Sequence, residues 1–498
     1  MSENIESKSE TLQKFQTPDM KIPVIFHASK KLLPNEYTFS QLENLGKNEK
    51  IFSHIAAVSD VHPKKGRKNP TGTIVASRNH IFPQINDTAP NCGMRFLKTN
   101  LNEENFSAEK IDELFNELVK VIPTKKFIGT KIPFSLVMNI AKKGVKPITE
   151  YFDTHTKNEI ENTYQNGNIV EKKDITNKDI FNVIPKLFLY TGKYRLGILG
   201  AAGNHFLDLM KITDIKNNEI AEKFNLKKGQ YIFLLHTGSG LLGQYASYMY
   251  TPKVKEHLSQ KIMLAIGTAL FKTPFKKEYK KLQKKIKEYQ DKNDFFSYDE
   301  NSTTGKMFTL AHQVAANFGV ANRSIITHNL DNALEKIVGK KIDLELLYDM
   351  PHILNIKEHH LGETVWVHRN GTSRANGPKR MQNHPLFSQT GEPVFIPSSM
   401  STPAYLGVGT NENVSSFFSA SHGTGRRAKT EGNLAKNKKD LLNHMDKACV
   451  KLYNAKSKGV ILQDSGYYKD IEEVIKGMES NKMIKSVVKM QPIAVLMY

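Results

Sequence analysis

YIFLLHTGSG, residues Tyr231 to Gly240, is a run of five apolar residues that leads directly into a histidine and a glycine-rich turn. A short apolar run bounded by turn residues is typical of a buried β-strand. A histidine at the tip of such a strand projects into a cleft. We therefore predict a strand over residues 231–235 and regard His236 as a candidate functional residue.

Strand and helix patterns alternate irregularly on both sides of this stretch. Apolar residues at 111–119 recur at helical spacing after Ser107, a suitable N-cap. Residues 470–478 also predict a helix, and residues 484–496 predict strands interrupted by Pro492. Because there is no βαβ regularity and no repeat of roughly 20–50 residues, we predict an α+β fold of mixed sheets flanked by helices.

Residues 275–289 predict an amphipathic helix with a strongly basic face. Mostly Lys, Glu and Gln separate its apolar positions, which are Phe275, Tyr279, Leu282, Ile286 and Tyr289. We interpret residues 270–300 as a basic helical insertion in one large core, residues 46–498. Residues 1–45 are polar and would form an N-terminal extension or cap. The simplest interpretation of the basic face is a solvated surface, and contact with an RNA backbone is the alternative.

The composition favours a polyanionic partner. Lys and Arg total 71 of the 498 residues against 50 Asp and Glu, so the formal net charge is +21. This charge favours nucleic acid ahead of a membrane, although base-composition bias in the genome is an alternative explanation. The two cysteines imply no disulfide framework. Neither a signal peptide nor an apolar run of about 18 residues occurs, so we expect a cytoplasmic protein with no membrane partner.

A second stretch carries a histidine among small residues. Ser419 to Thr430 reads SASHGTGRRAKT, in which three cationic residues follow His422. Small residues let a backbone approach a ligand closely, and cations attract phosphate, so the stretch suggests a phosphate-binding loop. A Walker A loop needs G-x-x-x-x-G-K-[ST], but Ala428 stands where the second glycine should be. We therefore do not expect a P-loop nucleoside triphosphatase.

Four residues have the side chains and local settings of metal ligands. They lie at glycine turns or at the ends of apolar runs: Cys92, His205, His236 and His352. Any one of them alone is more often structural. Their spacings are too long for a zinc finger, and no C-x-x-C occurs. If they form a site, the whole fold assembles it, which is typical of a catalytic centre.

Nine short motifs occur along the predicted core. They are SDVH (59–62), NCGM (91–94), GNHF (203–206), HTGSG (236–240), YDMPH (348–352), HRNGTSRA (368–375), SSMST (398–402), SHGTGR (421–426) and YKD (468–470). Each motif alone is only weak evidence for a family. Together, and in this order, they resemble the RtcB family of RNA ligases.

The resemblance implies an activity and its cofactors. Members of this family join RNA 3′-phosphate or 2′,3′-cyclic phosphate ends to 5′-hydroxyl ends in tRNA splicing or RNA repair. They use GTP and about two Mn²⁺ ions per chain, and His422 corresponds to the histidine that becomes guanylylated. An archease-type activator is a further possible partner, and we expect a monomer. The alternatives are a paralogue with altered nucleotide or end specificity, including nucleotidyl transfer without ligation, and a non-catalytic RNA-binding relative.

The resemblance also implies the roles of single residues. Cys92 would bridge both metals. His205 would complete the first site, and His236 with His352 would complete the second. Arg426 would contact the RNA phosphate. The remaining nucleotide-binding positions would be Asn204, Asp208, Ser399, Gly423, Gly425 and Tyr468, with Asp208 in place of a glutamate that recognises guanine.

Several positions depart from the family pattern. Ala89 stands where the family has a metal-binding aspartate, and the nearest acid is Asp87, which a different loop path would bring to the first metal. Met497 replaces a lysine that contacts the guanine, and Ala404 replaces a serine close to the same base. With Asp208, these changes would lie at the purine end of the nucleotide. We therefore expect that nucleotidyl transfer is retained while base selectivity is relaxed or altered.

Overall fold

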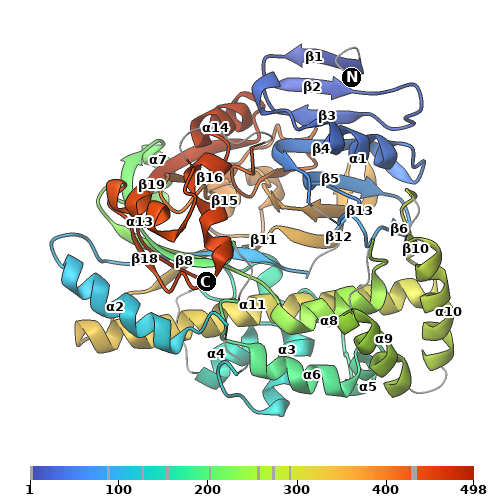
Figure 1. Ribbon diagram of the computed structural model, residues 1–498, viewed down its shortest axis with the longest axis horizontal. Helices are drawn as coiled ribbons and strands as arrows, with labels where there is room; N and C mark the ends of the chain where they lie inside the picture. Colours follow the sequence, from blue (N-terminus) through green and yellow to red (C-terminus); the bar gives the residue numbers. More distant parts are fainter. Residues whose placement is uncertain are drawn as a thin grey trace.

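The computed structural model describes residues 4–64, 66–86, 90–125, 128–152, 158–200, 204–254, 258–271, 275–290, 293–427 and 434–498. They form two large sheets with helices packed around them, which confirms the predicted α+β class. Figure 1 shows the N-terminal strands at the top, the C-terminal strands beside them and most of the helices along the lower side. No helix within these ranges is long and apolar enough to cross a membrane.

The larger sheet has eight strands and supports the candidate site. Their order is β11-β7-β9-β8-β19-β16-β15, with β18 paired in parallel to β19. Their bounds are β7 Gly93–Lys98, β8 Phe206–Ile215, β9 Tyr231–Thr237, β11 Glu345–Pro351, β15 Pro393–Ile396, β16 Ala404–Gly409, β18 Lys451–Tyr453 and β19 Ile484–Met497. β9 confirms the strand predicted over 231–235, and all of its residues are buried. A strand covered on both faces explains the unbroken apolar run.

The second sheet has seven strands in the order β1-β2-β3-β4-β5-β13-β12. Their bounds are β1 Ile5–Ser9, β2 Leu12–Phe15, β3 Val24–His27, β4 Ile51–His62, β5 Thr71–Ser77, β12 Ile353–His360 and β13 Glu363–Asn370. β1 to β3 and α1 (Glu36–Gly46) come from the segment interpreted as an N-terminal extension, and β3 joins them to the sheet by pairing with β4. A boundary at residue 45 stays a prediction. Two short pairs complete the strands: β6 (His80–Ile81) with β10 (Tyr298–Asp299), and β14 (Thr372–Arg374) with β17 (Ser419–Ser421).

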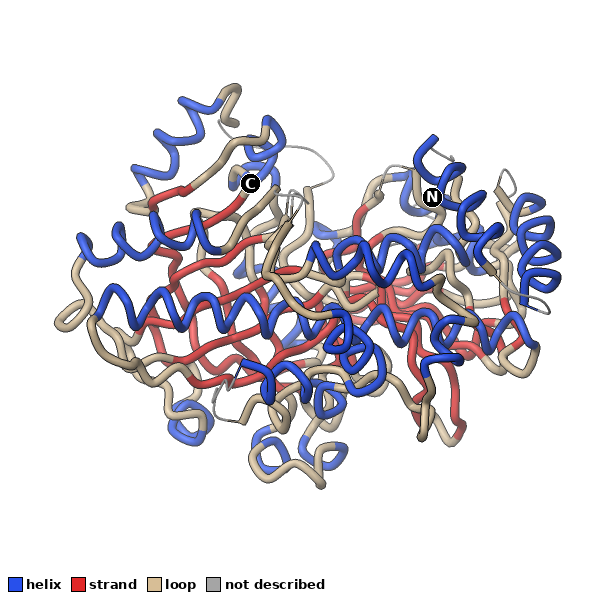
Figure 2. Tube along the Cα trace, turned by 90° about the horizontal axis from the view of Figure 1, so that it is seen from below, coloured by secondary structure: helices blue, strands red, loops and turns tan. Residues whose placement is uncertain are grey.

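The longest helix, α11 (Thr303–Val338), lies in the helical layer below the sheets. Figure 2, seen from below, shows helices of this layer in front of the strands. The middle of α11, residues 315–322 (AANFGVAN), is buried on every side, as in a helix surrounded by protein. Its small residues allow close approach, since a Cβ at Gly319 would lie 2.4 Å from the carbonyl oxygen of Asn91. α11 thus packs directly against the loop that carries Cys92.

Other helices confirm the predictions made from periodicity. α2 (Ala108–Val121) begins after Ser107, whose hydroxyl accepts a hydrogen bond from a backbone N–H of the first turn. α10 (Phe275–Glu288) buries the apolar stripe of the basic segment, and α14 (Ile471–Ser480) covers the third predicted helix. The remaining helices are α3 Phe134–Lys143, α4 Lys146–Phe152, α5 Asn177–Phe181, α6 Lys186–Gly192, α7 Asn218–Lys223, α8 Gly240–Tyr250, α9 Leu258–Leu270, α12 Phe387–Thr390 and α13 Lys438–Lys447.

The prediction that Pro492 interrupts the strand over 484–496 is wrong. β19 runs without a break from Ile484 to Met497. Its pairing with β8 shifts register between Pro492 and Ala494. A β-bulge therefore accommodates the one residue type that cannot donate a hydrogen bond to the ladder.

Candidate metal centre and neighbouring histidine

The strand ends of the larger sheet bring predicted metal ligands together. Cys92 immediately precedes β7, and His236 lies near the end of β9. Gly93 pairs with Thr237 in the antiparallel register, so the start of β7 lies beside the end of β9. The thiol and the imidazole therefore lie side by side at one edge of the sheet.

The flanking strands bring two further histidines to the same edge. His205 precedes β8, whose first residue pairs with His236. His352 follows β11, whose last residue pairs with Gly93. The antiparallel order β11-β7-β9-β8 thus collects one thiol and three imidazoles from distant parts of the sequence.

The four side chains contact one another in sequence. The Cys92 sulfur lies 3.4 Å from Nε2 of His205 and 3.3 Å from Nε2 of His236. Nε2 of His236 lies 3.3 Å from Nε2 of His352. The potential ligand atoms of Cys92, His236 and His352 all lie within 4.8 Å of one another, which makes these residues a candidate metal site. One sulfur therefore contacts two separate histidines.

The chemistry of these donors fits a metal ion. Nδ1 of His205 lies 2.9 Å from the carbonyl oxygen of Leu199, so Nδ1 carries the proton and Nε2 keeps a lone pair toward the sulfur. Among the described residues, Nε2 of His236 and Nε2 of His352 contact no carbonyl oxygen, and a shared cation would satisfy both. Sulfur and imidazole nitrogen suit divalent transition metals. Residues 87–89, with Asp87 and Ala89, lie outside the described residues, so a carboxylate ligand here stays a prediction.

Burial keeps these ligands neutral. It raises the pKa of the Cys92 thiol to about 11 and lowers the pKa of His205 to about 4. Burial first, and neighbouring histidines second, also hold the pKa values of His236 and His352 well below their usual value. Near neutral pH the histidines therefore offer lone pairs, whereas the thiol must lose a proton before it binds a metal.

His422 lies beside this group and is oriented by a carboxylate. Its Nδ1 lies 2.8 Å from Oδ2 of Asp60, whose side chain is fully buried. Nδ1–H therefore donates to the carboxylate, and Nε2 keeps the lone pair. The ring centroids of His422 and His352 are 4.4 Å apart. The His422 imidazole thus lies next to a candidate metal ligand.

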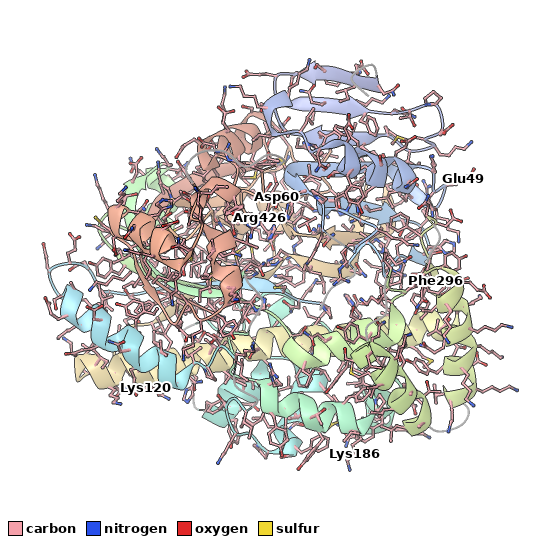
Figure 3. The ribbon with its side chains drawn as sticks, viewed as in Figure 1. Glu49, Asp60, Lys120, Lys186, Phe296 and Arg426 are labelled. Atoms are coloured by element: carbon pink, nitrogen blue, oxygen red, sulfur yellow. The ribbon has the colours of Figure 1, made fainter. Side chains whose placement is uncertain are left out.

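Two glycines and a buried lysine hold Asp60 in place. A Cβ at Gly72 would lie 2.6 Å from Oδ1 of Asp60, and a Cβ at Gly425 would lie 2.4 Å from its carbonyl oxygen. The Lys469 ammonium donates to the carbonyl oxygens on either side of Asp60, at 2.6 and 3.2 Å. Figure 3 labels Asp60 beside Arg426, where the C-terminal segment meets β4. The carboxylate that orients His422 therefore has little freedom to move.

A buried guanidinium holds the backbone next to the ligands. Arg323, on α11, donates from Nη1 to the carbonyl oxygens of Asn91 and Thr237 at 3.1 and 3.0 Å. Each of these residues directly adjoins a candidate ligand. Arg323 also donates from Nη2 to Oδ1 of Asp349 at 2.7 Å, on the strand that leads to His352. One side chain therefore joins three of the segments that carry the ligands.

A second arginine, Arg95, helps to compensate the negative charge of Asp349. Arg95 donates from Nε to Oδ2 of Asp349 at 2.8 Å and from Nη1 to Glu159 at 3.1 Å. Burial opposes ionisation of Asp349, but Arg323 and Arg95 hold its pKa below the usual value. The two arginines and two carboxylates thus compensate one another inside the protein.

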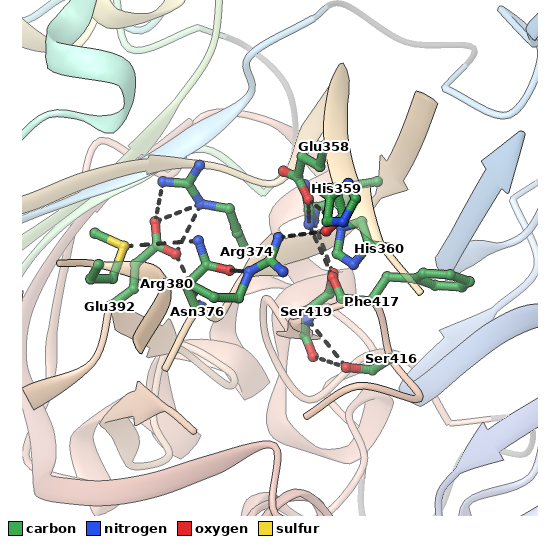
Figure 4. A network of polar contacts seen from close by, with 12 residues as sticks. Glu358, His359, His360, Arg374, Asn376, Arg380, Glu392, Ser416, Phe417 and Ser419 are labelled. Carbon is green, nitrogen blue, oxygen red and sulfur yellow. Dashed lines mark hydrogen bonds and ion pairs between the residues drawn. The ribbon is translucent and has the colours of Figure 1, made fainter. Parts of the chain in front are cut away.

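A further buried network supports β17, the strand that leads to His422 (Figure 4). Arg369 donates to the Ser419 hydroxyl on β17 at 2.9 Å. It also donates to both carboxylate oxygens of Glu358, at 2.7 and 2.8 Å. Arg374, on the paired strand β14, donates from Nη2 and Nε to Glu392 at 2.8 and 2.9 Å. These two-point contacts fix the direction from which the chain enters the His422 loop.

Sequence analysis missed the roles of Asp60 and Arg323. Asp60 stands in the SDVH motif, but nothing local links it to His422. Arg323 stands in ANRS on a helix in which buried positions are otherwise mostly apolar or small. The available signal was an arginine within a helical stretch of mostly apolar and small residues, because a buried charge requires partners.

The predicted phosphate-side positions lie in loops. Asn204 is exposed. Ser399 is buried, and its hydroxyl lies 2.8 Å from the Thr402 hydroxyl. A Cβ at Gly423 would lie 3.1 Å from the carbonyl oxygen of Pro397, so any residue other than glycine after His422 requires a slight shift of its neighbour. The part of these residues in nucleotide binding stays a prediction.

Arg426 and Tyr468 form one unit. The guanidinium lies over the tyrosine ring, 4.7 Å from its centroid, and the two backbones form a β-bridge. Nη2 of Arg426 and the Tyr468 hydroxyl both donate to Oε1 of Gln463. The residue predicted for RNA phosphate and the residue predicted for the nucleotide therefore depend on each other's position.

The substituted positions at the predicted purine end lie along β8, β16 and β19. Asp208 is buried on β8, its Oδ1 has no hydrogen-bond partner among the described residues, and burial raises its pKa. Met497 pairs with Phe206, which lies two residues before Asp208. The side chains of Met497 and Asp208 are therefore diagonal neighbours across the two strands. Ala404 pairs with Met490, in the first half of β19. The registers thus bring Asp208 next to Met497 but do not bring Ala404 there.

We expect Arg323 to control both stability and metal binding. Arg323→Met removes one of the two guanidinium partners of Asp349 and leaves the buried carbonyls of Asn91 and Thr237 without this donor, so it should lower the free energy of unfolding by about 3–5 kcal/mol. Arg323→Lys keeps the charge but loses the planar fork, so it should lose less stability and still weaken metal binding. Denaturant unfolding and metal titration measure the two effects. Arg78→Met, which breaks the exposed pair with Glu363, is the control and should cost at most about 1 kcal/mol. Similar losses of unfolding free energy in Arg323→Met and Arg78→Met would contradict the assignment of Arg323 as a support of the metal centre.

We expect metal binding to release a proton from Cys92. The thiol is protonated below its pKa of about 11, and the pKa of His205 at about 4 leaves that imidazole neutral. Apparent metal affinity should therefore rise about tenfold per pH unit between about pH 6 and 9. Isothermal titration in buffers of different ionisation enthalpy counts the protons. Cys92→Ala should remove the slope, and a flat profile in the unsubstituted protein would exclude thiolate ligation.

Comparison with known proteins identifies the family. The sequence profile of the family described as tRNA-splicing ligase RtcB matches residues 41–497. The tRNA-splicing ligase RtcB of Nanoarchaeum equitans is 27% identical over 497 residues, which cover 96% of this chain and 95% of the relative. The RNA-splicing ligase RtcB homolog 1 of Entamoeba dispar is 29% identical over 426 residues, which cover 82% of this chain and 71% of the relative. Because the profile spans nearly the whole chain and every residue of the Cys and His cluster, this chain belongs to the tRNA-splicing ligase RtcB family.

Proposed function

We propose that the chain is an RNA ligase that joins RNA 3′-phosphate or 2′,3′-cyclic phosphate ends to 5′-hydroxyl ends, in tRNA splicing or RNA repair. The observation that carries the proposal is the pairing of His422 Nδ1 with Asp60, which leaves Nε2 as a nucleophile beside a Cys and His cluster. The net charge of +21 supports a polyanionic substrate.

The first step in this proposal is guanylylation of His422. Nε2 attacks the α-phosphorus of GTP, a P–N bond forms, and pyrophosphate leaves. Asp60 accepts a hydrogen bond from Nδ1–H and stabilises the positive charge that develops on the imidazole. A phosphoramidate is reactive enough to pass its group on.

The next two steps seal the RNA. A 3′-phosphate oxygen of the RNA attacks the phosphorus on His422, the P–N bond breaks, and the imidazole regains its lone pair. The 5′-hydroxyl oxygen then attacks the activated 3′-phosphorus, a phosphodiester forms, and GMP leaves. A 2′,3′-cyclic end needs prior opening by water to a 3′-phosphate. Arg426, held over Tyr468, is the proposed contact of the RNA phosphate.

The proposed cofactors are GTP and about two Mn²⁺ ions per chain. Cys92, His205, His236 and His352 would hold the metal ions, and the ions would offset phosphate charge. An archease-type activator and a monomeric, cytoplasmic state belong to the same proposal.

An altered nucleotide specificity is the second candidate. It is favoured by Asp208, whose buried Oδ1 has no hydrogen-bond partner in the described part of the chain, and by its diagonal neighbour Met497, since these two side chains differ in chemistry from glutamate and lysine. An aspartate side chain is shorter than glutamate and reaches less far toward a base. A methionine, unlike a lysine, offers the base no hydrogen-bond donor. Nucleotidyl transfer with another purine, or without ligation, is the corresponding activity.

We expect His422→Ala to abolish covalent labelling of the protein by α-³²P-GTP in the presence of Mn²⁺. Asp60→Asn should slow labelling by about 10²-fold or more, because the imidazole loses its orienting carboxylate. Gel autoradiography measures the adduct, which should be labile in acid and stable in alkali. His359→Ala, at an exposed histidine, is the matched control and should label normally. Labelling of His422→Ala at the normal rate would exclude it as the nucleophile.

We expect the base preference to depend on Asp208 and Met497. The unsubstituted chain should label with α-³²P-ATP at a rate within about tenfold of that with GTP, because a lost hydrogen bond to a base costs about 1–3 kcal/mol. Asp208→Glu combined with Met497→Lys should shift the ratio toward GTP. A strong GTP preference in the unsubstituted chain would contradict relaxed selectivity, and no label from either nucleotide would contradict the transferase itself.

A further inference from the structure

Helix α9 presents four large apolar side chains outward. The exposed fractions are 74%, 51%, 38% and 45% for Leu258, Ile262, Ile266 and Leu270. The buried residues of this helix are instead Gln260 and Gly267. Surface helices normally bury their apolar stripe against the core. α9 therefore packs Met263 against the core but leaves a second apolar face exposed.

The exposed residues form one continuous stripe. They are spaced four residues apart, so they lie on successive turns and span about 18 Å at a rise of 1.5 Å per residue. Lys261 is the one charged residue of α9. Residues 254–270 hold more large exposed apolar side chains than any other stretch of this length in the described ranges. Clustered apolar exposure of this kind marks an interaction surface.

The protein holds the helix firmly in this orientation. A Cβ at Gly267 would lie 3.6 Å from Phe188 of α6 and 3.7 Å from Met249 of α8, so the inner face packs at contact distance. α10, the next helix along the chain, is anchored to α8 as well, since the hydroxyl of Tyr279 donates to the Met249 carbonyl at 3.1 Å. The stripe therefore lies on a supported surface.

The helices packed next to α9 carry more cations than acids. α10 carries seven lysines and two glutamates. α6 and the turn after it, Lys193–Arg195, carry three cations and no acid. Figure 1 shows α6, α9 and α10 next to one another at the lower right. The surface thus combines an apolar centre with a cationic rim.

We propose that the outward face of α9 is a docking surface for an acidic protein that presents an amphipathic helix of about three turns. The apolar stripe requires an apolar complement, and the cationic rim requires acidic residues beside it. A second copy of this chain would bring like charges together, because each chain carries a net +21. RNA would satisfy the cations but has no apolar face to cover the stripe.

A membrane is a weaker match than a protein. Interfacial helices anchor with aromatic residues at the level of the lipid headgroups. α9 contains no Trp, Tyr or Phe. Its Leu and Ile side chains suit the interdigitated packing of two helices.

The test uses the full chain and a fluorescein-labelled helical peptide with leucine on one face and glutamate elsewhere. We expect this peptide to bind at least about tenfold more tightly than a scrambled isomer of the same composition, measured by anisotropy. Ile262→Ser combined with Ile266→Ser should weaken binding by about tenfold or more, because it removes apolar area from the middle of the stripe. Lys276→Gln with Lys280→Gln should reduce the dependence of the affinity on salt.

Controls separate docking from folding and from catalysis. Leu361→Ser, at a residue that is 51% exposed in the β12–β13 turn, should leave peptide binding unchanged. The α9 double variant should keep normal nucleotide labelling and tRNA binding, since its side chains lie outside the Cys and His cluster and are already exposed.

Several results overturn the proposal. They are equal binding of the ordered and scrambled peptides, no binding of the ordered peptide, and unchanged binding by the α9 double variant. Loss of tRNA binding in that variant would assign the face to RNA, and loss of binding to phosphatidylserine vesicles would assign it to a membrane. A concentration-dependent dimer in sedimentation velocity that the variant abolishes would assign the face to a second copy of the chain.

Discussion

The buried guanidinium of Arg323 is the interaction on which the candidate centre depends. Carbonyl oxygens at strand ends and loops normally find water, but those of Asn91 and Thr237 face the interior and need donors. A planar fork with five donors serves both carbonyls and Asp349 at once, which an ammonium group cannot do. The sheet supplies the register, and Arg323 supplies the rigidity that keeps the strand ends together without support from solvent.

Local pattern was enough to predict the elements but not the site geometry. The strand at 231–235 and the helices after Ser107 and at 275–289 follow from periodicity, since each buries its own apolar face. The convergence of Cys92 with three histidines depends on the strand order β11-β7-β9-β8. That order is not a local property, so only the resemblance to a family connected these residues before the structure did.

Long-range packing explains what sequence reasoning could not provide. The sequence pattern predicted that Pro492 interrupts a strand, but a β-bulge in the pairing of β19 with β8 accommodates the proline. Asp60 gained its role from the contact with His422, which lies hundreds of residues away. In α9 the periodicity is clear, yet the neighbours α6, α8 and α10 decide which face turns inward. Periodicity predicts that a helix has two faces and leaves their orientation to the rest of the fold.

The position of β19 has a consequence for how the protein is made. This strand lies inside the larger sheet, between β8 and β16, yet its residues are the last of the described chain to be synthesised. Until they are available, β8 and β16 present unpaired edges to the cell. The larger sheet cannot close before β19 has been synthesised, and pairing over such sequence distances is slow. A chain synthesised only as far as β16 therefore lacks the closed sheet, and protection of the open edges during synthesis becomes a requirement for folding.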